Sequence, residues 1–247
     1  MLINVENFKD FLKKATLNYY IDSVQVNYWK EGDVLKSSMV SKCSDVATIL
    51  NIPNNIFKEA NQDIELNFCA PKNDLKPFLD LIDSDEVKFK LHEKKIVLNN
   101  QVKVHFDDPS VISTLNSDGP QKGIDYFATL NLDEDVMSAF DKIKKIGSRF
   151  GKIYFTVSEG KLYVETTDKN NAYSNGISFE LENVEWENKP DHDLVIPFNY
   201  NLFVNLMNVI NGDEFQIKLA YFEQSGGGLI YAFKGEEEKY FLMSVVE

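Results

Sequence analysis

The two halves of this sequence repeat one another, and this repeat limits the chain to folds in which one unit occurs twice. Residues 85–91 (DEVKFKL) agree at four of seven positions with residues 213–219 (DEFQIKL), which lie 128 positions further along. The same offset places Leu75, Phe78, Leu79 and Ile82 on Phe203, Leu206, Met207 and Ile210, and Phe8, Phe11, Leu12 and Ala15 on Val136, Ala139, Phe140 and Ile143. One offset that relates three separate segments indicates a duplicated domain.

Each half is predicted to contain a helix, a run of strands, a second helix and a further run of strands. Apolar spacings of three and four predict helices at 5–17, 74–82, 133–146 and 200–210, with Asp74 and Asp133 as helix starts. Alternating patterns predict strands at 24–29, 34–40, 64–68, 87–91, 95–98, 102–106, 153–157, 162–166, 174–181, 194–196, 215–220, 229–233 and 240–246. Asn99-Asn100 is predicted to form a turn, and glycines 226–228 a hairpin tip. The predicted class is therefore α+β, with two helices packed on antiparallel sheets in each of two domains.

Residues 107–123 separate the halves and have the composition of a linker, with Pro109, Gly119 and Pro120 among several serines. We therefore expect an N-terminal domain at 1–108, a connecting loop at 109–123 and a C-terminal domain at 124–247.

The overall charge argues against a chain that binds polyanions over its whole surface. The sequence has 39 acidic and 26 basic residues, a net charge of −13. No apolar run approaches the roughly 18 residues that a bilayer-spanning helix needs, and the first residues are too charged for a signal peptide. Cys43 and Cys69 are too few for a disulfide scaffold. We expect a cytoplasmic protein with reduced thiols and no membrane partner.

No catalytic or metal-binding motif stands out. His92, His105 and His192 have no second ligand at a metal-binding spacing, and the glycine triplet lacks the residues of a phosphate-binding loop. Acidic clusters at 83–86, 107–108, 133–135 and 236–238 lie in predicted turns or at a helix start. A carboxylate-dependent enzyme built on 107–108 and 236–238 remains an alternative. The favoured expectation is a protein without enzymatic activity, metal or cofactor.

The basic residues of the helices are unevenly placed. The first helix carries Lys9, Lys13 and Lys14, and residues 141–149 have a net charge of +3 that includes Arg149, the only arginine. The charges of the helices with their flanking residues, 5–17, 71–83, 133–150 and 198–211, sum to zero, so the whole net charge of −13 lies in the sheets and loops. Outward-facing lysines of ordinary amphipathic helices would explain the same pattern.

The chain resembles the sliding clamps of DNA replication, most closely those of tailed phages, which are related to the proliferating cell nuclear antigen. The resemblance is carried by the repeated order of elements, by residues 74–82 (DLKPFLDLI) leading into the hairpin at 86–98, by residues 159–162 (EGKL), and by the closing hairpin at 229–234 and 239–246. It implies a DNA-clamp fold without enzymatic activity. It also implies two-domain subunits that join head to tail as a homotrimeric ring, with helices lining a hole around double-stranded DNA.

The resemblance also implies site residues. The residues expected to face the phosphates are Lys9, Lys13, Lys14, Lys76, Lys142, Lys144, Lys145 and Arg149. The fourth helix departs from the family because Asn199, Asn201, Asn205 and Asn208 occupy places expected to be basic. A pocket for peptides of a DNA polymerase or clamp loader is expected at Val111, Ile112 and Leu115, although a loop packing on itself would also explain these residues. The subunit interface would pair Val102, Val104 and Phe106 with Ile177 and Phe179. The alternative is a clamp-fold scaffold that binds proteins without encircling DNA.

Overall fold

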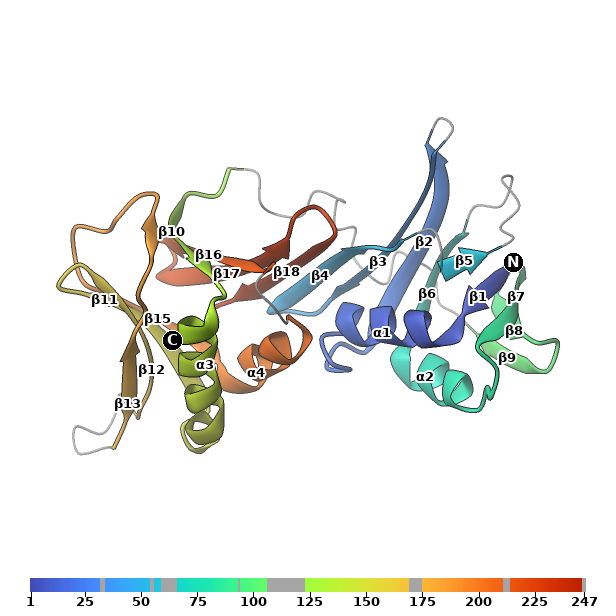
Figure 1. The fold of residues 1–247 in the computed structure, drawn as a ribbon, viewed down its shortest axis with the longest axis horizontal. Coiled ribbons are helices and arrows are strands. Elements are labelled where there is room, and N and C mark those ends of the chain that lie inside the picture. Colours follow the sequence, from blue (N-terminus) through green and yellow to red (C-terminus); the bar gives the residue numbers. More distant parts are fainter. Residues whose placement is uncertain are drawn as a thin grey trace. The chain divides into compact units, whose positions relative to one another are not determined.

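The computed structural model describes residues 1–31, 34–53, 56–58, 66–92, 94–105, 123–168, 175–210 and 214–245. The chain divides into two compact units (Figure 1). The first comprises Met1–Pro120 together with Glu236–Glu238, and the second comprises Gln121–Gly235 together with Lys239–Glu247. None of the helices in the described ranges combines the length and apolar character needed to cross a membrane.

The first unit contains two helices and nine strands in its described part. They are β1 (Leu2–Asn4), α1 (Val5–Ala15), β2 (Ser23–Glu31), β3 (Val34–Lys42), β4 (Val46–Asn51), β5 (Phe57–Lys58), β6 (Leu66–Pro71), α2 (Lys72–Asp80), β7 (Glu86–His92), β8 (Lys95–Leu98) and β9 (Val102–His105). The strands form two sheets, in the orders β5-β1-β7-β8-β9 and β4-β3-β2-β6.

The second unit repeats this sequence of elements. They are β10 (Tyr126–Asn131), α3 (Glu134–Ile146) with the short 3-10 helix η4 (Gly147–Arg149), β11 (Lys152–Ser158), β12 (Lys161–Thr166), β13 (Ile177–Glu180), β14 (Glu185–Trp186), β15 (Leu194–Asn199), α4 (Tyr200–Val209), β16 (Gln216–Phe222), β17 (Gly227–Lys234) and β18 (Glu238–Met243). Its strands take the orders β14-β10-β16-β17-β18 and β13-β12-β11-β15. Counted from the start of each unit, these orders equal those of the first unit, and the pairs are antiparallel. The predicted duplication and the α+β class are confirmed.

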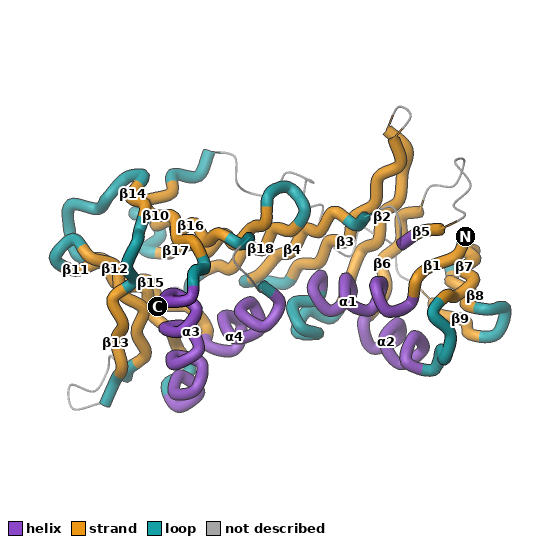
Figure 2. Tube along the Cα trace, viewed as in Figure 1, coloured by secondary structure: helices purple, strands orange, loops and turns teal. Residues whose placement is uncertain are grey.

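The helices of each unit bury most of the apolar positions that the repeat relates. Among the positions that the repeat relates, the buried ones are Phe8, Leu12 and Ala15 in α1, Val136, Ala139, Phe140 and Ile143 in α3, Leu75 and Leu79 in α2, and Phe203, Leu206 and Met207 in α4, whereas Phe11 and Phe78 are half-buried. In the second unit the rings of Phe140 and Phe203 meet edge to face, 5.3 Å apart, so α3 and α4 share one core. Figures 1 and 2 show the two helices of each unit lying together, beside the strands of that unit.

Some predicted boundaries are wrong, and two kinds of strand were missed. The search for alternating polar and apolar residues did not predict β4 and β10, in which the first five residues are all buried. A strand covered on both faces shows no alternation of polar and apolar residues. The short strands β1, β5 and β14 were also missed, because so few residues cannot display a period.

Two local predictions, a helix start and a hairpin tip, are wrong, and a third, an asparagine turn, is confirmed. Asp74 does not begin its helix, because α2 starts at Lys72. The glycine triplet does not form the hairpin tip throughout, since Gly227 and Gly228 lie in β17 opposite Phe222 and Tyr221, and a Cβ on Gly228 would overlap Ile196 Cγ2. The turn at Asn99-Asn100 is confirmed by φ values of 49° and 60°.

Candidate nucleic-acid interface

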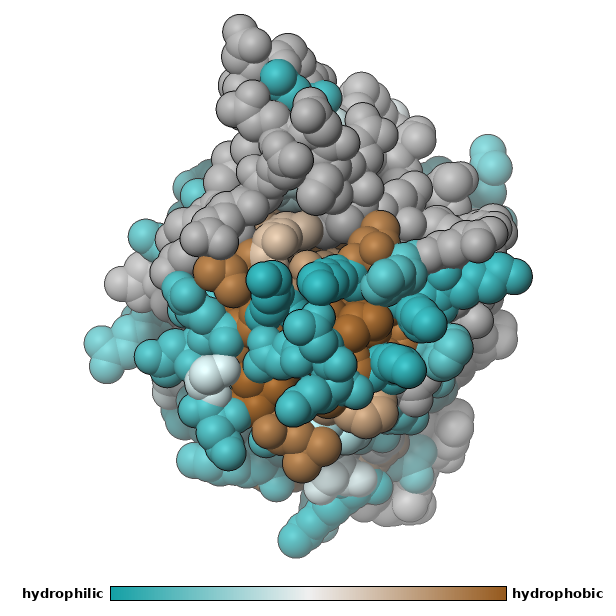
Figure 3. All heavy atoms as spheres, turned by 90° about the vertical axis from the view of Figure 1, so that its right-hand side faces the viewer, coloured by the Kyte–Doolittle hydropathy of each residue, from teal (hydrophilic) through white to brown (hydrophobic). Residues whose placement is uncertain are grey.

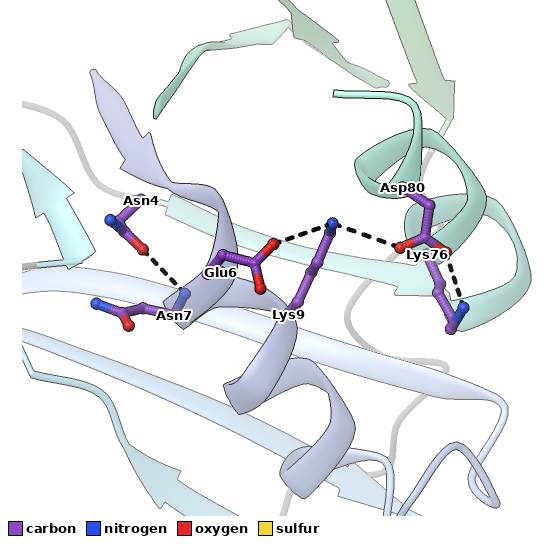
Figure 4. Close-up of polar contacts among 6 residues, drawn as sticks. All are labelled: Asn4, Glu6, Asn7, Lys9, Lys76 and Asp80. Carbon is purple, nitrogen blue, oxygen red and sulfur yellow. Dashed lines mark hydrogen bonds and ion pairs between the residues drawn. The ribbon is translucent and has the colours of Figure 1, made fainter. Parts of the chain in front are cut away.

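Two of the expected phosphate-binding lysines are neutralised at the contact between α1 and α2. Lys9 Nζ of α1 lies 3.4 Å from Glu6 Oε1 and 3.5 Å from Asp80 Oδ1 of α2 (Figure 4). Lys76 Nζ donates to Asp80 Oδ2 at 2.8 Å, and this hydrogen bond raises the pKa of Lys76 and lowers that of Asp80. Asn4 caps α1 by accepting a hydrogen bond from the Asn7 backbone N–H at 2.9 Å. Asp80 therefore forms ion pairs with two lysines that were expected to face the phosphates.

Lys14 also has acidic partners within the first unit, to which Glu238, the first residue of β18, belongs. Its Nζ donates to Glu238 Oε1 at 3.0 Å and lies 3.4 Å from Asp10 Oδ2. Burial by itself would lower the pKa of Lys14, but the hydrogen bonds and charges of Glu238 and Asp10 together outweigh it, so the pKa is raised. Lys13, in contrast, is exposed, and no carboxylate among the described residues forms an ion pair with it.

A basic stripe lies on the second half of α3 and its extension η4. Lys142, Lys145 and Arg149 are exposed, and their spacing of three and four residues puts them on one face. No ion pair joins these three to a carboxylate in the part of the chain that the structure describes. The Nζ of Lys142 lies 5.2 Å from the centroid of the Phe179 ring, and Lys144 instead pairs with Asp141 at 3.1 Å. We call Lys142, Lys145 and Arg149 the α3 stripe.

The fold holds the α3 stripe through contacts with α4. Tyr200 at the start of α4 donates its hydroxyl to the Lys144 backbone oxygen at 2.5 Å. Its ring packs so closely on Gly147 that a Cβ there would lie 2.6 Å from Tyr200 Cδ2. Asp133 caps the other end of α3 by accepting from the Val136 backbone N–H at 2.9 Å, as predicted.

The fourth helix carries no charged side chain on its described face. Asn199 is its N-cap and accepts from the backbone N–H groups of Asn201 and Leu202 at 2.9 and 3.2 Å. Asn201 and Asn208 are exposed, whereas Asn205 is half-buried. One of the four asparagines is thus explained by helix capping and not by a missing basic residue.

The strands expected at a subunit interface are edge strands. β9 ends one sheet of the first unit and β13 ends one sheet of the second. Val104 of β9 is buried, whereas Val102 of β9 and both Ile177 and Phe179 of β13 are half-buried. Figure 3 looks onto the side of the first unit where β7 to β9 lie, and shows apolar groups between more numerous hydrophilic ones. Phe106 and the expected pocket residues Val111, Ile112 and Leu115 lie outside the described residues.

Sequence reasoning missed the acidic partners and one aromatic stack. The spacing of Lys76 and Asp80, four residues apart on a helix, was a detectable signal, whereas Glu238 is far from Lys14 in sequence. On the face of the second unit's sheet opposite to Ile217 and Leu219, the Tyr231 ring stacks on the rings of Phe233 and Phe241, and the Tyr126 ring packs against it at a tilt. The hydroxyl of Tyr126 is buried without a hydrogen-bond partner, and burial together with the charge of Glu187 raises its pKa to about 12.

The described side chains that were considered for metal binding or catalysis do not cluster. In the described ranges, no three His, Cys, Asp or Glu side chains lie close enough to hold a metal ion. His192 contacts the neighbouring Asp191 at 2.8 Å on an exposed loop. Residues 107–108 of the carboxylate-enzyme alternative fall outside the described residues.

Comparison with solved structures identifies the fold. The sequence matches no family model and no curated protein. The structure is similar to the DNA polymerase III β chain of Streptococcus pneumoniae (TM-score 0.70, 10% identity) and to the β clamp of H. pylori in complex with 5-chloroisatin (TM-score 0.71, 13% identity), each match covering 99% of this chain and 64% of the other. The sliding clamp of Bartonella birtlesii bound to griselimycin has a TM-score of 0.67 at 18% identity and covers 99% and 65%. The chain has the sliding-clamp fold.

The clamp fold confirms the fold class that the sequence predicted. The chain spans slightly less than two thirds of the length of these bacterial clamps, so about a third of each has no counterpart here. At identities of 10–18% the likeness concerns the arrangement of the backbone. The kinship with phage clamps and with the proliferating cell nuclear antigen stays a prediction from the sequence.

Proposed function

We propose that this protein is a DNA sliding clamp: a non-enzymatic processivity factor that closes as a ring around duplex DNA and tethers a polymerase. The observation that carries the proposal is the clamp fold, whose duplicated units bear unneutralised cations on the first helix of each unit. These are Lys13 on α1 and the α3 stripe. Lysine suits contact with a sliding phosphate backbone, because a point charge on a flexible stem needs no fixed geometry.

The ring is a homotrimer of two-unit chains, in which β9 of one subunit pairs with β13 of the next. Both are edge strands, and an edge presents backbone N–H and C=O groups that a neighbouring strand can satisfy. Lys103 is exposed on β9, whereas Glu180 on β13 is exposed and already paired with Lys161 at 2.9 Å, so the pairing of the two edges rests on their backbone groups. A head-to-tail contact closes into a ring when its rotation fits the number of subunits.

The acidic composition is compatible with this role. A ring that encircles DNA is held by topology and needs little affinity, so a few cations toward the hole suffice. The net negative charge lies outside the helices and would repel DNA from other surfaces. Binding is then independent of base sequence and weakens with salt.

The remaining partners follow from the same role. The connecting loop, with Val111, Ile112 and Leu115, receives peptides of the DNA polymerase and the clamp loader. The protein acts in the cytoplasm, which is the host cytoplasm if the gene belongs to a phage. It needs no cofactor.

Retention on DNA of defined topology tests the proposal. A labelled sample is loaded onto nicked circular DNA with a clamp loader and then separated by gel filtration. We expect co-elution that is lost when the DNA is linearised, and a solution mass near three times the 28.3 kDa of one chain. A monomer at every concentration that is never retained on circular DNA would refute the ring.

A second candidate function is a clamp-fold scaffold that binds proteins without encircling DNA. Two observations favour it. Four of the eight expected cations form ion pairs with carboxylates, namely Lys9, Lys14, Lys76 and Lys144. The exposed face of α4 also carries no charge. Under this alternative, circular and linear DNA would be retained equally poorly, while peptides of partner proteins would still bind.

A further inference from the structure

A cleft of about 380 Å³ opens in the second unit between the start of β10, the loop from β14 to β15 and the end of β16. Its volume lies at the lower end of the ~300–1,000 Å³ range that is usual for ligand sites. None of its lining residues belongs to α3, α4, β9 or β13. The cleft is therefore separate from the α3 stripe and from the strands assigned to the subunit interface.

The wall of the cleft is anchored at both ends of the β14–β15 loop. The backbone N–H of Asn188 donates to the Phe127 carbonyl at 3.3 Å, and its side-chain amide donates to the Tyr126 carbonyl at 3.2 Å. At the other end, the Asp193 carboxylate accepts from the Ser158 hydroxyl at 3.0 Å. The loop is thus tied to both sheets of the unit, and the cleft exists before any ligand binds.

The cleft has an apolar floor and an acidic rim. Phe127 and Leu194 are each 5% exposed and form part of the lining together with the half-buried Tyr221. The carboxylates of Asp125 and Glu223 are exposed, and no described cation forms an ion pair with either of them. The cleft thus offers apolar contact below and unneutralised negative charge above.

The other charged groups of the lining do not neutralise the carboxylates of the rim. Asp191 adds a third exposed carboxylate, whose partner is His192 at 2.8 Å. Lys189, the only lysine among the described residues of the lining, places its Nζ 5.2 Å from the centroid of the Trp186 ring, where it contacts an aromatic face. The negative charge repels nucleic acid and favours a cationic ligand.

We propose that this cleft binds a short basic segment of a partner protein. An apolar side chain of the segment packs on Phe127 and Leu194, and Lys or Arg side chains on either side of it face Asp125 and Glu223. The proposal goes beyond the clamp function, and it does not require a closed ring or bound DNA.

Fluorescence anisotropy with three labelled peptides tests the chemistry of this cleft. The first peptide has one Phe flanked by Lys and Arg, the second replaces each basic residue by Glu, and the third replaces Phe by Ser. We expect the basic peptide to bind with an affinity that falls as salt is raised, the Ser peptide to bind about tenfold more weakly, and the acidic peptide not to bind. Equal binding of the basic and acidic peptides would overturn the proposal.

Charge reversal on the rim locates the binding. Asp125→Lys and Glu223→Lys change exposed side chains, so the fold should survive, and each should weaken the basic peptide about tenfold. The matched control is Glu182→Lys, an exposed residue of the same unit outside the cleft lining, which should leave the affinity within about twofold. Equal loss in all three variants, or no loss in the first two, would refute this site. Because the assay uses peptide and free protein, failure here leaves the DNA-retention result untouched.

Discussion

Asp80 Oδ1 of α2 lies 3.5 Å from Lys9 Nζ of α1, so one carboxylate joins the two helices of the first unit. The other oxygen of Asp80 accepts from Lys76 at 2.8 Å (Figure 4). This arrangement means that positive charges counted along the sequence are not all available to a phosphate backbone.

Replacing Asp80→Asn should release the charges of Lys9 and Lys76 for DNA. We expect affinity for a short duplex to rise roughly 2- to 10-fold and the salt dependence to steepen, because one or two more lysines can contact phosphates. Fluorescence anisotropy across a salt series measures both effects. Asp83→Asn, an exposed residue just beyond α2, is the matched control and should change neither. Weaker binding by Asp80→Asn would contradict the assignment of these lysines to the DNA-facing surface.

Removing the α3 stripe should lower DNA binding more than removing a neutralised lysine. Each of Lys142→Ala, Lys145→Ala and Arg149→Ala should reduce the slope of log affinity against log salt by about 0.9 if its cation contacts one phosphate. Lys144→Ala should have little effect, since Lys144 pairs with Asp141 at 3.1 Å. The same anisotropy assay distinguishes them. Equal slopes for all four variants would show that the stripe does not face DNA.

Gly147→Ala should destabilise the second unit. The added Cβ would lie 2.6 Å from Tyr200 Cδ2, and Tyr200 cannot easily move because its hydroxyl bonds the Lys144 carbonyl. Overpacking of this kind costs about 1–3 kcal/mol of unfolding free energy, which urea denaturation can measure. Ser148→Ala, at the exposed neighbouring position, should be nearly neutral. Combining Gly147→Ala with Tyr200→Ala should cost less than the sum of the two, and strict additivity would argue against the contact.

The stability of the protein at alkaline pH should depend on Tyr126. Burial and the charge of Glu187 raise the pKa of its hydroxyl from 10 to about 12, so the unfolded chain loses this proton first as the pH rises. The stability that comes from the neutral hydroxyl is complete below pH 10 and is lost between pH 10 and 12. Between pH 10 and 12 the unfolding free energy of Tyr126→Phe should therefore fall less steeply than that of the unchanged protein. Parallel curves for the two proteins would contradict the raised pKa.

Tyr126→Phe should also cost little stability at neutral pH. Its hydroxyl has no hydrogen-bond partner, so the substitution removes no bond and relieves a buried polar group. Urea denaturation at neutral pH checks this expectation, and a large loss would mean that the hydroxyl has a partner in solution.

Local sequence determined the helices and the duplication. Periodic apolar residues predicted the buried faces of α1 and α3, and Asp133 was recognised as a cap because its side chain acts on a backbone group three residues away. Asn99-Asn100 was recognised as a turn for a similar reason, since asparagine tolerates positive φ. These features depend on neighbours along the chain, or on a repeat that can be counted.

Only the tertiary structure decided which strands lie in the interior and which cations remain free. β4 and β10 are covered on both faces, so no local alternation marks them. Lys14 is neutralised by Glu238, 224 residues away, and Lys9 by Asp80 on another helix, whereas Lys145 and Arg149 meet no described carboxylate. Charge pairing depends on distances of a few ångströms between side chains, and folding brings such side chains together from distant parts of the sequence.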